Sequence, residues 1–168
     1  MNLQLRCVIG LLSFLLISGC GWHLRGSTNL SNIDSVALTL QIPASDFINI
    51  LTHEIQANQI AIKLPEEASY NIVIMRLFEE QRTVGIDGSG RAAKYLLTQT
   101  VEFVVQDKNG TPLSETISRS VEQTYDHDEN RALAKENERK ILQREMYMSL
   151  AHQVMRALNR AAENQAAE

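Results

Sequence analysis

Two alternating segments joined by a turn around Asn109-Gly110 constrain the fold of this chain more than any other feature. Apolar and polar side chains alternate over residues 95–106, and the alternation resumes over residues 113–125. A period of two residues is typical of a strand with one buried face, and Asn-Gly is a strong signal for a tight turn. The sequence therefore predicts an antiparallel hairpin. Gln99 is the only polar residue on the apolar side of its first strand.

A strand and a helix are predicted before this hairpin. Apolar residues alternate with less apolar ones over residues 36–42, which indicates a strand. Ser45 or Asp46 is the predicted cap of the following helix, and Asn58 is its predicted stop. The apolar residues between them share one helical face, and they are Phe47, Ile48, Leu51 and Ile55. Residues 60–64 alternate briefly and are expected to form a short extended piece.

A long strand is predicted over residues 70–86, which are rich in β-branched residues. Its two faces are expected to carry Ile72, Ile74 and Phe78 on one side and Val73, Met75 and Leu77 on the other. Glycines between residues 85 and 90 predict a flexible turn that leads into the hairpin.

The last predicted element is a helix that begins in the acidic patch formed by Asp126, Asp128 and Glu129. Negative charge is favourable at a helix N-terminus. One broad sector of the helix is apolar, and it comprises Met146, Tyr147, Met148, Leu150, Ala151, Val154, Met155 and Leu158. Such a helix covers a sheet. Beyond Ala161 the chain is expected to fray.

These elements predict an α+β fold. The expected architecture is a two-layer α/β sandwich, in which two helices pack on one face of a roughly four-stranded, mostly antiparallel, mixed sheet. The length of the chain fits one domain, which we place at residues 36–160. Residues 161–168 are predicted to form a flexible C-terminal tail.

The N-terminal segment has the order of an export signal. Arg6 precedes an apolar run that is shorter than the about 20 residues of a membrane-spanning helix, and small residues then lead into Cys20. Ile17-Ser18-Gly19-Cys20 resembles the bacterial lipobox, whose cysteine is acylated and becomes the first residue after cleavage. The alternative interpretation is a core helix followed by a buried thiol at Cys20.

The lipobox resemblance implies a lipoprotein signal peptide over residues 1–19 and a lipidated N-terminus with a tether over residues 20–35. Acyl chains, palmitate among them, would then anchor Cys20 to a membrane, because more than one chain gives stable attachment. Gly21 stands where an Asp commonly signals retention in the inner membrane. The resemblance therefore implies the outer membrane, with the folded part on its periplasmic side.

Composition narrows the possible functions further. The formal net charge is −4, with basic residues scattered along the chain, and this pattern does not favour nucleic-acid binding. Cys7 lies within the predicted signal peptide, and no cysteine follows Cys20. We therefore expect neither a disulfide nor a cysteine-ligated metal in the mature protein.

Two local motifs invite a catalytic or metal-binding interpretation. Gly88, Gly90 and Ala93 match G-x-G-x-x-A, but dinucleotide binding needs a helix directly afterwards, and an alternating segment follows instead. A hairpin loop is favoured. The cluster from Asp126 to Glu129 fits helix capping better than a cation site. No local catalytic motif is present, so we predict a protein that is not an enzyme and uses no cofactor and no metal.

Basic residues supply the candidate binding site. Arg91 and Lys94 flank the glycine-rich loop, and Arg76 and Arg82 lie on the long strand. Near the start of the last helix lie Lys135, Arg139 and Lys140. Solubility explains any one of them taken alone. A lipoprotein of the outer membrane nevertheless meets the phosphate groups of lipopolysaccharide, with which lysine and arginine form charge-assisted hydrogen bonds. These basic residues, Arg91, Lys94 and Lys135 among them, are therefore candidates for binding lipopolysaccharide.

Two signatures resemble those of the LPS-assembly lipoprotein LptE family. The first is Cys20-Gly21-Trp22-His23-Leu24-Arg25-Gly26, which resembles the mature N-terminus of that family. The second comprises residues 130–138, which read NRALAKENE, followed by residues 144–147, which read REMY. Both occur in the order of the family, and the elements predicted between them fit its fold.

The resemblance implies two helices on a four-stranded sheet, seated in the lumen of the outer-membrane β-barrel LptD. The two proteins together would deliver lipopolysaccharide to the cell surface. Lys135 matches a family position implicated in contacting lipopolysaccharide. Gly88 aligns with a second such position, which is an arginine in the family, and Arg91 is its displaced substitute.

Three classes of function remain open at this point. The first is a lipoprotein that assists LptD and binds lipopolysaccharide directly. The second is a purely structural plug or scaffold for a barrel, with no ligand site. The third is a generic lipid-carrier lipoprotein that faces the periplasm, although the sequence offers few aromatic residues for an acyl cavity.

Overall fold

The computed structural model describes residues 33–127 and 132–167. In chain order, the elements of this part are β1 (Ser35–Leu40), α2 (Asp46–Ala57), β2 (Ala61–Ile62), β3 (Tyr70–Ile86), β4 (Ala92–Asp107), β5 (Ile117–Asp126) and α3 (Ala132–Ala166). The predictions for the signal peptide, Cys20 and most of the tether lie outside the described residues.

A single mixed sheet has the strand order β2-β1-β3-β4-β5. β1 pairs in parallel with both β2 and β3, whereas β3, β4 and β5 pair antiparallel. The predicted sandwich is confirmed, with five strands in place of about four. The additional strand is the short extended piece predicted after the first helix.

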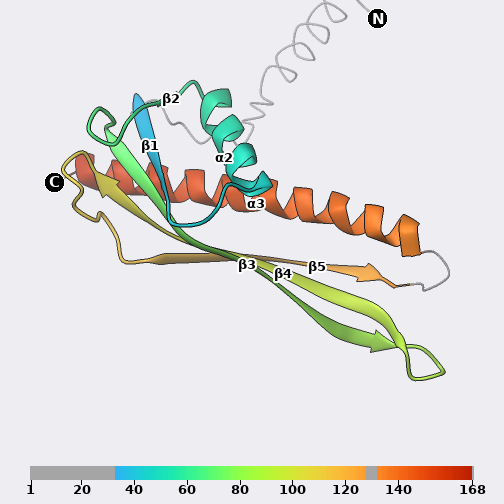
Figure 1. The fold of residues 1–168 in the computed structure, drawn as a ribbon. Coiled ribbons are helices and arrows are strands. Elements are labelled where there is room, and N and C mark those ends of the chain that lie inside the picture. Colours follow the sequence, from blue (N-terminus) through green and yellow to red (C-terminus); the bar gives the residue numbers. More distant parts are fainter. Residues whose placement is uncertain (1–32, 128–131, 168) are drawn as a thin grey trace, which may run out of the picture.

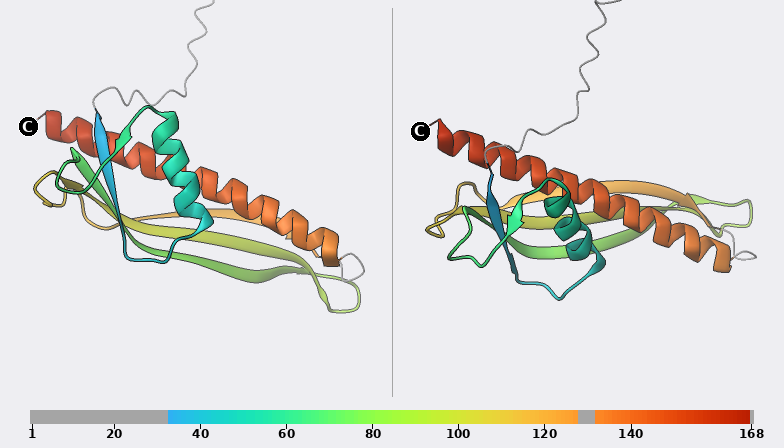
Figure 2. Two further views of the ribbon diagram at one scale, coloured as in Figure 1. Left: turned by 45° about the horizontal axis from the view of Figure 1, so that its top comes forward. Right: turned by 90° about the horizontal axis from the view of Figure 1, so that it is seen from above.

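Both helices lie over the same face of the sheet, as Figure 2 shows. α3 runs along most of the length of the sheet, and α2 lies over the end of the sheet that contains β1 (Figure 1). The main core fills the space between the two helices and the sheet. In it, the rings of Phe47 on α2 and Tyr147 on α3 lie 5.8 Å apart. The described part of the opposite face carries no helix, and an antiparallel sheet can leave one face polar in this way.

A β-bulge at Met75 reverses the two faces of β3. Ile74 pairs with Phe103, but Arg76 pairs with Glu102, so β3 contains one extra residue. From Leu77 to Thr83, where the next register shift begins, the odd-numbered residues of β3 face the helices. Phe78 is therefore 43% exposed and does not share the face of Ile72 and Ile74, and that prediction was wrong.

The turn between β4 and β5 is built around Asp107. Its carboxylate accepts hydrogen bonds from the backbone N–H of Asn109 and of Thr111, both at 2.8 Å. Gly110 has a φ of 79°, a conformation that favours glycine. The predicted hairpin is confirmed, although regular pairing of the second strand begins at Ile117 and not at residue 113.

α3 differs from its prediction at both ends. It begins at Ala132, while Asp126 ends β5 and pairs with Lys94 at 3.5 Å, so Asp126 does not cap the helix. Asp128 and Glu129 lie outside the described residues. The helix continues to Ala166 instead of fraying beyond Ala161, because alanine has a high helix propensity and Ala162 packs on the core.

Candidate functional site

The predicted basic residues lie at the same end of the molecule. Figure 1 shows the β3–β4 loop, the end of β5 and the start of α3 together at the end of the sheet far from β1. Arg91, Lys94 and Lys135 come from these neighbouring elements. Their side chains do not converge on one point, since Lys94 faces the helix-free side in register with Asp126, whereas Lys135 lies on the helix side.

A pocket of 370 Å³ lies between the start of α3 and the sheet. It is lined by Gln81, Tyr95, Tyr125, His127, Lys135 and Glu136. The pocket takes residues from β3, β4, β5 and α3, which are far apart in the sequence. Sequence analysis identified only Lys135 among them.

Aromatic rings form one wall of this pocket. The rings of Tyr95 and Tyr125 lie 5.6 Å apart, and the ring of His127 meets Tyr95 edge-on at 5.0 Å. The hydroxyl of Tyr125 donates a hydrogen bond to Gln81 Oε1 at 3.4 Å. Burial raises the pKa of Tyr125 above the ordinary value of a phenol.

Lys135 supplies the positive charge of the pocket. Its side chain is 19% exposed, and its Nζ donates to Glu138 Oε2 at 2.8 Å. A charge-assisted bond of this length holds the ammonium group in place. An anion that enters the pocket would have to compete with Glu138 for Lys135.

Arg91 belongs to a structured loop. The carboxylate of Asp87 accepts hydrogen bonds from the backbone N–H of Ser89 at 2.8 Å and of Arg91 at 3.0 Å. Arg91 Nε also donates to Asp87 Oδ2 at 3.3 Å. The predicted turn is present, and Asp87 acts in it as Asp107 does in the turn between β4 and β5, whereas its flexibility stays a prediction.

Hydrogen bonds, led by that from the Ser89 hydroxyl, hold the pKa of Asp87 well below its usual range. We expect an NMR titration to find a lower pKa for Asp87 in the folded protein than in a peptide of residues 85–92. Because the folded pKa is the lower one, the stabilisation is complete above the unfolded value of about 3.9 and is lost as the pH falls through the folded pKa. Equal pKa values in protein and peptide would contradict this geometry.

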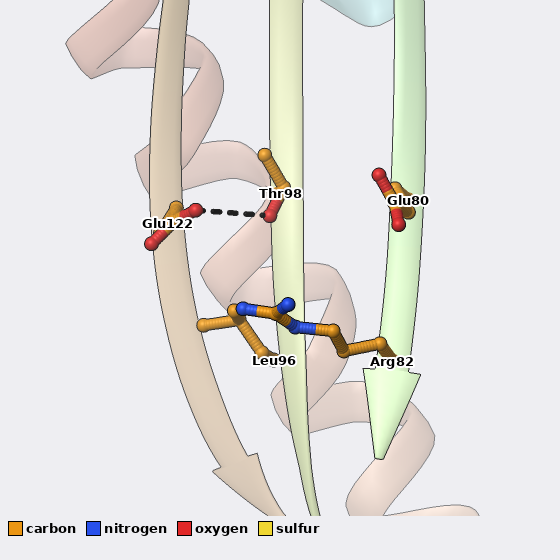
Figure 3. A pocket seen from close by; sticks show the side chains of 5 residues that line it. All are labelled: Glu80, Arg82, Leu96, Thr98 and Glu122. Atoms are coloured by element: carbon orange, nitrogen blue, oxygen red, sulfur yellow. Dashed lines mark hydrogen bonds between the residues drawn. The ribbon is translucent and has the colours of Figure 1, made fainter. Parts of the chain in front are cut away.

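The helix-free face offers a different chemistry. A pocket of 140 Å³ lies there. Figure 3 shows the side chains that line it, of which Glu80, Thr98 and Glu122 form a row across three strands. Thr98 Oγ1 donates to Glu122 at 3.5 Å, and Arg82 extends over Leu96 (Figure 3). This face therefore presents many hydrogen-bonding groups and suits contact with a polar protein surface.

A third pocket lies between α2 and α3. It has a volume of 430 Å³, and it is lined by Asp46, Asn49, Ile50, Lys140, Gln143, Arg144 and Tyr147. Burial raises the pKa of Tyr147. Lys140 and Arg144 on α3 face Asp46 on α2, so basic side chains outnumber the acidic one in this groove.

The described residues contain neither a cluster suited to a metal ion nor a helix suited to span a membrane. Among them, no group of three or more His, Cys, Asp or Glu side chains could hold a metal ion. No helix in the same part of the chain combines the length and apolar character needed to cross a membrane.

Comparison with known proteins gives a consistent family. A family model described as LptE, lipopolysaccharide-assembly, matches residues 33–158. The LPS-assembly lipoprotein LptE of Pectobacterium atrosepticum is 30% identical over 159 residues, covering 90% of this chain and 82% of the relative. That of Photorhabdus laumondii is 28% identical over 153 residues, covering 88% of this chain and 81% of the relative.

Solved structures share the fold. The rare lipoprotein B of Shewanella oneidensis superimposes with a TM-score of 0.69 at 19% identity, covering 79% of this chain and 98% of the other. A lipoprotein B of Nitrosomonas europaea gives a TM-score of 0.68 at 19% identity, covering 83% of this chain and 90% of the other. At this identity the likeness concerns the fold alone.

Proposed function

The chain belongs to the LptE lipopolysaccharide-assembly family, and on that premise we propose that it is an outer-membrane lipoprotein that forms a plug-and-barrel complex with LptD and binds lipopolysaccharide directly. Acylated Cys20 anchors it on the periplasmic side, and the folded domain occupies the barrel lumen. The protein acts by binding and performs no catalysis.

Ligand binding is supported mainly by the position of Lys135, whose side chain lines the pocket together with Tyr95 and Tyr125. The phosphate groups of lipopolysaccharide accept hydrogen bonds from an ammonium group, and Lys135 can donate such bonds from a partly shielded position. Arg91 and Lys94 lie outside the pocket but at the same end of the molecule, where they add positive charge for a ligand with more than one phosphate group. Together these residues would loosen the lateral association of lipopolysaccharide molecules during delivery.

Contact with the barrel is supported by the helix-free face. Many of its side chains are Ser, Thr, Glu and Arg, with the exposed ring of Phe78 among them, and several form cross-strand pairs, such as Thr100 with Ser120 at 2.8 Å. A polar and largely rigid face loses little side-chain freedom when it docks. The inner wall of a water-filled barrel is polar as well, so the two surfaces match.

A purely structural plug is the second candidate, because Lys135 already has a partner in Glu138. Charge reversal at both Lys135 and Arg91 separates the two functions. If the protein binds its ligand, this variant still forms the complex with LptD but fails in lipopolysaccharide transport. A plug without a ligand site would transport normally. The described residues offer no comparable observation for a generic lipid carrier.

Affinity purification from outer membranes tests the complex. We expect LptD to co-purify with the full-length protein at equal stoichiometry, and mass spectrometry to find an acylated N-terminal Cys20. The matched control is Cys20→Ala, which removes the anchor and lowers recovery from the outer membrane. Recovery without a large β-barrel, or with an unmodified thiol at Cys20, would contradict the proposal.

A further inference from the structure

The first third of α3 is held on the sheet almost without apolar contacts. None of residues 133–145 is buried, and Leu133 and Ile141 are 83% and 61% exposed. The first buried residue of the helix is Met146, and only Leu142 packs partly beside it. An apolar stripe is what normally fixes a helix to a sheet. Something else must position the segment that carries Lys135.

Glu79 on β3 supplies that contact. Its Oε1 accepts a hydrogen bond from Arg139 Nη1 at 3.1 Å, and its Oε2 accepts one from Gln143 Nε2 at 3.0 Å. Arg139 and Gln143 are one helical turn apart on the face of α3 that meets the sheet. Arg139 also holds Glu136 through two bonds of 3.1 Å. One carboxylate therefore joins two turns of the helix to the sheet.

Gln99 orients Glu79 from the sheet side. It is fully buried on β4, and its Nε2 donates to Glu79 Oε2 at 2.9 Å. The other amide atom, Oε1, has no hydrogen-bond partner among the described residues. A buried oxygen without a partner costs about 1–3 kcal/mol. Gln99 is the only polar residue in the apolar stripe of β4, and it orients Glu79 at a cost in local stability.

We infer that Glu79 is a positioning residue for the Lys135 site, because it docks the first third of α3 on the sheet. Lys135 lies one turn before Arg139 on the same face, so release of Arg139 also moves Lys135 away from Tyr95 and Tyr125. Only the docked helix closes the pocket that Lys135 lines. This inference rests on the proposed function, since it concerns affinity for lipopolysaccharide.

A charge swap tests the contact. Glu79→Arg and Arg139→Glu are each expected to speed amide hydrogen exchange over residues 133–143 and to leave the exchange of β4 unchanged. If the helix is docked in about a tenth of the molecules, the apparent Kd for purified lipopolysaccharide rises about tenfold. Glu79→Gln, which removes the charge and keeps the size, gives a smaller change in the same direction.

The double variant Glu79→Arg with Arg139→Glu is expected to recover slow exchange and much of the affinity. Gln99 and Gln143 permit the swap, because an amide that rotates by half a turn accepts where it previously donated. Recovery is partial, since the new carboxylate on α3 lies one turn from Glu136. A double variant as defective as the single ones would overturn the inference, as would unchanged exchange in all of them.

Lys135→Glu separates this inference from the proposed function. It is expected to weaken lipopolysaccharide binding without faster exchange over residues 133–143. If neither Lys135→Glu nor Glu79→Arg changes binding, direct ligand binding by this site is wrong. If Lys135→Glu weakens binding and Glu79→Arg does not, the ligand site stands and the positioning role of Glu79 is overturned.

Discussion

Lys135→Glu should weaken the binding of purified lipopolysaccharide to the full-length protein by at least about tenfold. A hydrogen bond to a charged group contributes about 1.5–3 kcal/mol, and each 1.4 kcal/mol is a factor of ten in Kd. Charge reversal also adds repulsion, since the new carboxylate faces both the ligand phosphates and Glu138. Titration of the detergent-solubilised protein with lipopolysaccharide at fixed ionic strength measures the change.

The matched control for this prediction is Lys140→Glu. Lys140 is on the same helix and is exposed, but it lines the groove with α2 and not the tyrosine-lined pocket. Both variants change the net charge equally, so a general electrostatic effect would weaken binding equally. Equal loss in the two variants, or no loss for Lys135→Glu, would contradict a specific role for Lys135.

The local order of elements could be predicted because it depends on short-range patterns. Alternation over residues 70–86 gave the bounds of β3 correctly, and the turn residues of the hairpin were recognised from Asn109-Gly110. The placement of Asp126 at the start of α3 was wrong, because an acidic residue suits a helix cap and an ion pair equally well. Asp126 pairs with Lys94 across two strands, and that pairing becomes visible only when the register of the strands is known.

The candidate site depends on longer-range geometry. Lys135 was found through a family signature, but the wall of tyrosines around it is brought together by three strands and one helix. Glu79 was not identified because one extra residue at Met75 decides which face of β3 it lies on. Regular alternation from Ile74 would point Glu79 away from the helices. Only Gln99 indicated a polar contact here, because a polar side chain on the apolar face of β4 requires a polar partner.

Phe103→Ala should destabilise the protein by about 3–5 kcal/mol, the usual cost of removing a fully buried phenylalanine. Phe103 is fully buried on the interior strand β4, in register with Ile74 on one side and Ile117 on the other. Few side chains can move to fill such a cavity, because its neighbours belong to paired strands. Chemical denaturation of the full-length protein in detergent measures the loss.

Phe78→Ala is the matched control, and it tests the β-bulge directly. If β3 alternated regularly from Ile74, Phe78 would face the helices and its removal would cost as much as that of Phe103. The bulge instead places its ring on the helix-free face, 43% exposed, with the Arg76 guanidinium 5.6 Å from the ring centroid. Loss of this contact costs about 0.5–1 kcal/mol, plus a fraction of the transfer energy of the ring. Equal destabilisation by both substitutions would contradict the bulge, and with it the placement of Glu79 beneath α3.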